Sequence, residues 1–181
     1  VSRHVTAEQL VRTMIGQVRR VLTPELRAAA AARGLSVRQL MTLASIVEKE
    51  TGAADERALV SAVYANRLRI GMGLQCDPTV IYALQREGRF DGNLRRDDLA
   101  FDSPYNTYRY PGLPPGPIAA PGRASIEAAA HPADAGYLYF VSRNDGTHAF
   151  ARTLDEHNRN VQTFQVQYFR EHRGADSRRA R

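Results

Sequence analysis

A proline-rich stretch past the middle of the chain restricts the fold more than any other feature of the sequence. Six of the nine prolines lie between residues 104 and 121, interleaved with Tyr105, Tyr108 and Tyr110. Proline fixes φ and removes a backbone donor, so this stretch excludes a regular helix or a central strand. We therefore expect a long, stiff loop. Such loops often form binding surfaces, and a packed structural cover is the alternative interpretation.

Length and composition indicate one compact domain. The chain has 181 residues, 43% of them apolar, which is enough for a single sizeable core. We assign residues 1–170 to this domain and residues 171–181 to a polar, Arg-rich tail that we expect to be disordered. No apolar run approaches the ~20 residues that a transmembrane helix needs. The net charge is +6, but the basic residues are scattered among acids, so we do not expect a nucleic-acid partner.

Apolar periodicity and capping signals predict a helix-rich α+β fold. The expected helices cover residues 6–22, 24–32, 37–51, 55–69, 79–84, 125–130 and 154–170. Two short strands, at 137–141 and 148–151, form the expected β-hairpin around an Asn-Asp-Gly turn. We expect the last helix to bury Val161, Phe164, Val166 and Phe169, and the hairpin aromatics Tyr137, Tyr139 and Phe140 to lie in the core.

Two acids, Glu48 and Glu50, end the predicted helix at residues 37–51. The polar face of this helix is expected to hold Arg38, Thr42, Ser45 and Lys49. Both glutamates lie off that face and diverge by roughly 160°, so they cannot flank one scissile bond as a pair. The negative end of the helix dipole and partial burial both raise a carboxyl pKa toward the range of a general acid. Helical geometry does not separate the two acids.

Other chemistries have weaker support in the sequence. An end-of-helix acid paired with Arg57 or Arg67 is the structural alternative to a general acid. The five histidines show no metal-ligand spacing, so we expect no metal site. Cys76, the single cysteine, is expected to be a small buried hydrophobe. Asp77 before Pro78 is explained equally well as a helix N-cap.

Several blocks of the sequence, in order, carry a family resemblance over about residues 40 to 165. They are LASIVEKET (43–51), ANRLRIGM (65–72), LQCDPTVIY (74–82), SPYNTY (103–108), GLPPGPI (112–118), AAAHP (128–132), YLYFV (137–141) and HN (157–158). In these blocks the chain resembles the endolytic murein transglycosylase, or YceG-like, family.

The resemblance implies cleavage of the β-1,4 bond between N-acetylmuramic acid and N-acetylglucosamine in nascent peptidoglycan, leaving a 1,6-anhydromuramoyl end. By this resemblance the catalytic acid is Glu50. The pair Glu50-Thr51 is similar to the Glu-Ser pair on the catalytic helix of lysozyme-like transglycosylases. Such a reaction requires no metal or organic cofactor. The residues in the matched blocks that could line a glycan groove are Gln75, Asp77, Tyr105, Asn106 and Tyr108.

The resemblance also implies a setting for the domain. Family members usually carry a cytoplasmic tail, one transmembrane helix and a LysM-like domain before the catalytic domain. It thus implies a single-pass protein of the cell membrane whose catalytic domain works outside the cytoplasm with peptidoglycan synthases. Cys76 stands where Thr is frequent in the family, a change expected not to touch the acid. A non-catalytic glycan-binding module is the main alternative, and a basic nucleic-acid-binding domain is a lesser one.

Overall fold

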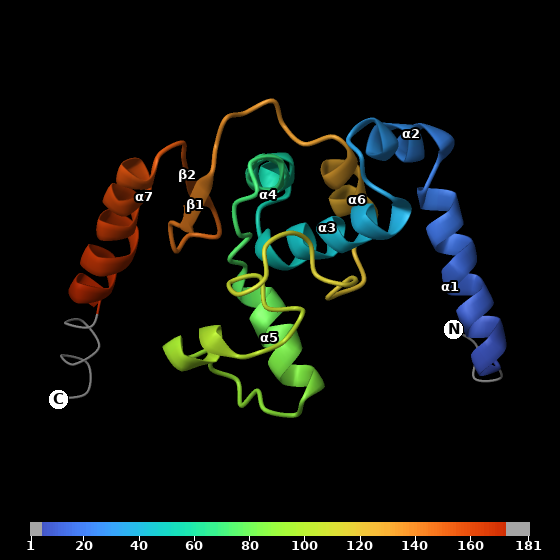
Figure 1. Cartoon of the computed structure of the whole chain (residues 1–181), viewed down its shortest axis with the longest axis horizontal. Helices are drawn as coiled ribbons and strands as arrows, with labels where there is room; N and C mark the ends of the chain where they lie inside the picture. Colours follow the sequence, from blue (N-terminus) through green and yellow to red (C-terminus); the bar gives the residue numbers. More distant parts are fainter. Residues whose placement is uncertain (1–4, 173–181) are drawn as a thin grey trace.

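The computed structural model describes residues 5–172, and it has the expected α+β architecture (Figure 1). The helices are α1 (Ala7–Val21), α2 (Pro24–Ala32), α3 (Val37–Glu50), α4 (Arg57–Arg69), α5 (Asp77–Arg86), α6 (Arg123–Ala130) and α7 (Leu154–Val161). Short helical turns, η1 (Ala54–Glu56) and η2 (Arg96–Ala100), precede α4 and follow α5. The described strands are β1 (Tyr139–Ser142) and β2 (His148–Ala151).

Local capping explains where the helices begin. The Thr23 side chain accepts a hydrogen bond from Leu26, and Pro24 takes the first position of α2. At α3, the Ser36 side chain and Gln39 form the predicted reciprocal capping box. These short-range signals place the starts of α2 and α3 at their expected positions.

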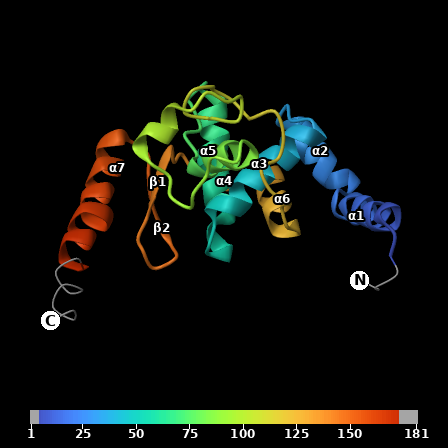
Figure 2. The same cartoon turned by 90° about the horizontal axis from the view of Figure 1, so that it is seen from below.

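Helix α3 is the centre of the fold, and both views show it inside the body of the molecule (Figures 1 and 2). It packs against α2, α4, α5 and α6, and Leu40, Leu43, Ile46 and Val47 are fully buried. The expectation that one side of this helix is polar and exposed is wrong for the middle of the helix. Thr42 and Ser45 are also buried, and the proline-rich segment contacts Ser45 through Ile118.

The proline-rich segment, residues 104–121, contains no helix or strand, as predicted. It is fastened to α3 by two hydrogen bonds between distant parts of the chain. Arg38 donates to the carbonyl of Pro115 at 2.9 Å, and the Ile118 N–H donates to the Ser45 hydroxyl, also at 2.9 Å. The segment therefore serves as a structural cover over α3.

The hairpin forms as expected but begins two residues later. Strands β1 and β2 are antiparallel, with Tyr139 opposite Ala151 and Ser142 opposite His148. Asn144 and Gly146 adopt positive φ (66° and 90°), which closes the tight turn between the strands.

The last helix buries only part of the apolar face assigned to it: Val161 and Phe164 are half-buried, whereas Val166 and Phe169 are exposed. From α7 the chain continues through a π-helical segment, η3 (Gln162–Gln167), and remains helical to residue 172. Because it packs mainly on the hairpin, Val166 and Phe169 remain 41% and 46% exposed. Residues 171–172, which we assigned to the tail, belong to this helix. The rest of the predicted disordered tail, 173–181, lies outside the described residues.

Helix α1 lies at the opposite end of the molecule from α7 in both views (Figures 1 and 2). Its predicted apolar stripe is present, but Val11, Met14, Ile15 and Val18 are exposed to solvent. Among residues 5–172, no helix combines the length and apolar character that crossing a membrane requires.

Candidate active site

The carboxyl group of Glu50, at the end of α3, lies in the wall of a cleft of about 510 Å³. The cleft is lined by α3, α4, the start of α5 and the segment before it, the proline-rich segment, the hairpin and α7. Its lining residues are Glu50, Tyr64, Arg67, Leu74, Gln75, Asp77, Tyr108, Tyr139, Phe140, Val141, Leu154, His157, Asn158 and Val161. Segments far apart in the sequence thus converge on one acid.

Two hydrogen-bond donors hold the Glu50 carboxyl. The Tyr64 hydroxyl donates to Oε1 at 2.8 Å, and the Cys76 thiol lies 3.0 Å from the same oxygen. Burial raises the pKa of Glu50 above its ordinary value, although both hydrogen bonds oppose that shift. A carboxyl with a raised pKa retains its proton closer to neutral pH, as a general acid must.

No ion pair neutralises Glu50 within the described part of the chain. Arg67, one expected partner, is buried and donates instead to the backbone carbonyls of Leu138 (2.7 Å), Leu74 (2.8 Å) and Gly73 (3.3 Å). Arg57, the other, makes no salt bridge to this acid across residues 5–172. The alternative of an arginine-paired acid is therefore wrong for Glu50.

Glu48 has the opposite environment. It accepts a 2.5 Å hydrogen bond from the Ser125 hydroxyl and a 3.2 Å bond from the Gly122 N–H. The Ser125 bond is the main cause that lowers the pKa of Glu48. The expectation that both acids have raised pKa values is wrong for Glu48, so the structure separates the two acids where helical geometry could not.

The contact of Cys76 with Glu50 corrects another expectation. The residue is buried, as predicted, but its thiol touches the candidate acid instead of simply filling the core. Its backbone N–H donates to the Thr107 hydroxyl at 3.0 Å, which fixes Cys76 just before α5.

The side walls of the cleft contain aromatic groups that we expected in the core. Tyr139 and Phe140 are only partly buried and line the cleft. Phe140 packs edge-on against Tyr64 with ring centroids 5.9 Å apart. His157 stacks on Tyr139 at 5.2 Å, and burial lowers its pKa, so a neutral imidazole is favoured.

Three of the five expected glycan-binding residues line the cleft: Gln75, Asp77 and Tyr108. Gln75 is exposed and has a φ of 49°. The proposed N-cap role of Asp77 is wrong, because Cys76 occupies the N-cap position and Asp77 is the first residue of α5. The Asp77 carboxylate instead accepts a 2.5 Å hydrogen bond from the Tyr108 hydroxyl, and burial together with this bond raises the pKa of Tyr108 above its ordinary value.

The other two expected residues lie outside the cleft. Asn106 is fully buried, and its amide donates to the carbonyls of Leu99 (3.0 Å) and Phe101 (2.7 Å). Tyr105 packs against Tyr82, with ring centroids 4.9 Å apart. Both residues stabilise the proline-rich segment to which they belong. Neither is placed to bind a ligand beside Glu50.

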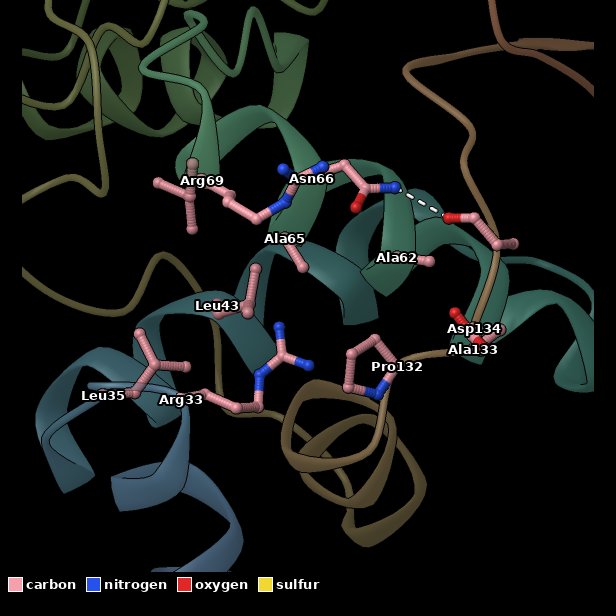
Figure 3. Close-up of a pocket in the computed structure, with 12 residues that line it drawn as sticks. Arg33, Leu35, Leu43, Ala62, Ala65, Asn66, Arg69, Pro132, Ala133 and Asp134 are labelled. Atoms are coloured by element: carbon pink, nitrogen blue, oxygen red, sulfur yellow. Dashed lines mark hydrogen bonds between the residues drawn. The ribbon is translucent and has the colours of Figure 1, made fainter.

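A second, larger cavity of about 590 Å³ (Figure 3) shares no lining residue with the cleft at Glu50. Its walls come from the end of α2, from α3 and α4, and from the segment after α6. Asn66 crosses one edge and donates to the Ala135 carbonyl at 2.7 Å. Asp134 is the acid among its lining residues, and no group of three His, Cys, Asp or Glu residues suited to a metal occurs within residues 5–172.

Sequence reasoning missed Tyr64, Arg67 and His157 as members of the site. Tyr64 is buried in α4. A buried tyrosine needs a partner for its hydroxyl, and that requirement was the available signal. Nothing in the local pattern identified the partner as Glu50, 14 residues earlier.

Taken together, the fold and cleft define a helix-rich α+β domain with one uncompensated acid at the end of its central helix. Residues 1–163 match the family model described as the YceG-like family. The chain belongs to this family.

Curated relatives and a solved structure agree with this assignment. The chain is 46% identical over 125 residues to an endolytic murein transglycosylase of Bacillus subtilis (strain 168), covering 69% of this chain and 34% of that protein. It is 33% identical over 165 residues to an endolytic murein transglycosylase of Streptococcus pneumoniae serotype 2 (strain D39), covering 89% and 30%. A crystal structure of a putative yceG-like protein from Listeria monocytogenes is similar with a TM-score of 0.76 and 39% identity, covering 88% of this chain and 50% of that one. The chain thus spans about a third of the length of these two curated relatives.

Proposed function

We propose that this domain is an endolytic lytic transglycosylase acting on peptidoglycan. The names of the two curated relatives support the substrate class. Within that class, we propose cleavage of the bond between N-acetylmuramic acid and N-acetylglucosamine, with formation of a 1,6-anhydromuramoyl end.

One observation carries this proposal: the carboxyl of Glu50 lies in an open cleft, with a raised pKa and no cation paired to it across residues 5–172. A glycosidase that uses water generally needs a second carboxylate as base or nucleophile. A transglycosylase needs one acid, because the nucleophile is the C6 hydroxyl of the sugar itself.

The proposed reaction uses Glu50 twice. Protonated Glu50 gives its proton to the glycosidic oxygen as the C1–O bond breaks, and the bonding electron pair leaves with that oxygen. The 2-acetamido group of the muramoyl unit stabilises the positive charge at C1, as in substrate-assisted glycosidases. The C6 hydroxyl then bonds to C1, and its proton returns to the Glu50 carboxylate.

The remaining groups of the cleft suit a carbohydrate. Tyr108 offers a flat aromatic ring of the kind that packs against sugar rings. Gln75 and Asn158 offer amide groups that match acetamido substituents. We assign these residues to binding and assign proton transfer to Glu50.

Digestion of uncrosslinked glycan strands, followed by mass analysis, tests this proposal. We expect products lighter by one water than hydrolysis products, lost in Glu50→Gln and retained in Glu48→Gln. The two variants are matched, because they make the same change two residues apart on one helix. Circular dichroism and thermal unfolding establish that both are folded.

Three outcomes contradict the proposal. Normal cleavage by Glu50→Gln removes the catalytic assignment. Products that retain the water indicate hydrolysis. Glycan binding without any bond cleavage identifies the domain as a non-catalytic binding module instead.

We further propose that the domain works outside the cytoplasm, in a protein anchored in the cell membrane by one helix and acting beside peptidoglycan synthases. The support is the location of the proposed substrate. Fractionation of cells producing the whole protein, with protease added to the outer face, tests the topology. Protection of the domain from that protease contradicts it.

A further inference from the structure

The two hydrogen-bond donors at Glu50 both reach the same carboxyl oxygen. Tyr64 comes from α4 and Cys76 from the start of α5, and each contacts Oε1. No hydrogen bond from residues 5–172 reaches Oε2. Oε2 is also not among the buried atoms without a partner in this part of the chain, so it is open to the cleft.

This arrangement decides which oxygen carries the proton. A neutral carboxylic acid has one O–H donor, and its other oxygen accepts hydrogen bonds through two lone pairs. A proton on Oε1 would face the hydrogens of Tyr64 and Cys76. A proton on Oε2 leaves both lone pairs of Oε1 to the two donors.

Cys76 is a donor here because its thiol remains protonated. Burial, together with the adjacent Glu50, raises the pKa of the thiol well above its ordinary value. A second negative charge beside the carboxyl is therefore disfavoured, and the S–H group points its hydrogen at Oε1.

We propose that Cys76, together with Tyr64, is a positioning residue: the pair holds Oε1 of Glu50 as the accepting oxygen, so that Oε2 carries the proton and delivers it to the substrate. This inference rests on the proposed function. The Oε2–H bond breaks as the glycosidic oxygen takes the proton, and Oε2 later recovers a proton from the C6 hydroxyl. Cys76 and Tyr64 keep their own protons throughout.

The two donors also set the strength of the acid. Hydrogen bonds to a charged acceptor are stronger than those to a neutral one, so the donors stabilise the carboxylate that forms in the reaction. Burial without them would leave Glu50 a much weaker acid. Loss of one donor thus raises the pKa of Glu50 and slows proton delivery.

The test compares Cys76→Val with Cys76→Thr in the full 181-residue chain. The two side chains have nearly the same shape, and only threonine has a donor. Activity is followed against pH on uncrosslinked glycan strands. The Glu50 carboxyl is titrated by 13C NMR in protein labelled at glutamate, with Glu50→Gln identifying its signal.

We expect Cys76→Val to move the Glu50 midpoint and the alkaline limb of activity upward by on the order of one pH unit. Cleavage should fall by on the order of tenfold. Cys76→Thr should restore both values to near those of the native chain. Tyr64→Phe should shift the midpoint in the same direction, which provides a second test if Cys76→Val does not fold.

Equal midpoints in Cys76→Val and Cys76→Thr overturn this inference, as does an unshifted midpoint in Tyr64→Phe. These results are distinct from a failure of the proposed function, which normal cleavage by Glu50→Gln reveals. The NMR titration needs no substrate, so it tests the donor geometry whatever the reaction proves to be.

Discussion

The Ser125 hydroxyl on α6 donates a 2.5 Å hydrogen bond to Glu48 on α3, across 77 residues of sequence. This bond ties together two helices that pack closely in the core. It also gives Glu48 a role distinct from that of Glu50, since one acid is held as a carboxylate and the other is pushed toward its neutral form.

The lowered pKa of Glu48 makes this bond sensitive to acid. A depressed folded-state pKa contributes stability above the unfolded pKa, and the contribution is lost as the pH falls through the folded pKa. We expect Ser125→Ala to lower the free energy of unfolding by about 1 kcal/mol at pH 7 and by less at pH 3. Urea unfolding at both pH values measures this difference. An equal loss at both would show that the Glu48 charge plays no part.

Glu50 predicts the reverse pH dependence. Its pKa is raised in the folded state, so its contribution to stability is present below the unfolded pKa and is lost as the pH rises through the folded pKa. We expect Glu50→Gln to be more stable than the native chain at pH 8, by about 1 kcal/mol, and the gain to vanish near pH 4. Thermal and urea unfolding of both proteins measure the gain. A variant less stable than the native chain at pH 8 contradicts it.

Removal of the Asn106 side chain should reduce stability without directly reducing glycan binding. Its buried amide satisfies two backbone carbonyls, so Asn106→Ala leaves them without partners. We expect the free energy of unfolding to fall by about 2–3 kcal/mol. The matched comparison is Tyr108→Phe, which lies in the cleft and should weaken glycan affinity more than stability. If the Asn106→Ala variant were fully folded but had lost glycan affinity, this separation between a stability role and a binding role would be wrong.

The apolar residues of helix α1 that are exposed should be replaceable with little loss of stability. Ile15 is 48% exposed, whereas Ile46 on α3 is fully buried. We expect Ile15→Glu to change the free energy of unfolding by less than about 0.5 kcal/mol. Ile46→Ala should cost about 2–5 kcal/mol. A large loss of unfolding free energy in Ile15→Glu would mean that the apolar face of α1 is packed against another surface in solution.

Much of the fold could be predicted because its signals are local. The capping box of Ser36 and Gln39 and the Thr23-Pro24 pair placed two helix starts within a residue. The density of prolines correctly excluded regular structure at residues 104–121. These effects act over three or four residues, which a sequence displays directly.

Tertiary packing caused the errors. Thr42 and Ser45 have polar side chains at helical spacing but are buried, and a segment some 70 residues away contacts Ser45. Val166 and Phe169 show helical periodicity without an opposing surface to bury them. A pattern predicts which residues share a face, and it does not specify what lies against that face.

The candidate site shows the same division. Family resemblance selected Glu50, whereas the donors that control it are 14 and 26 residues away on separate elements. Cys76 was identified as buried but not as a partner of the acid. The proximity of Glu50, Tyr64 and Cys76 results from the packing of α3, α4 and α5, which no local spacing encodes.

The attachment of Ile118 to Ser45 has a consequence for biosynthesis. A ribosome completes the helix that ends at Glu50 long before it synthesises the segment that shields the middle of that helix. Contacts of such long range form late, and the nascent intermediate exposes an unshielded strip of α3 until then. Products that terminate before residue 118 also lack α6, which packs closely on α3, and should therefore aggregate. A slow stretch of translation just before residue 118 would prolong that vulnerable interval.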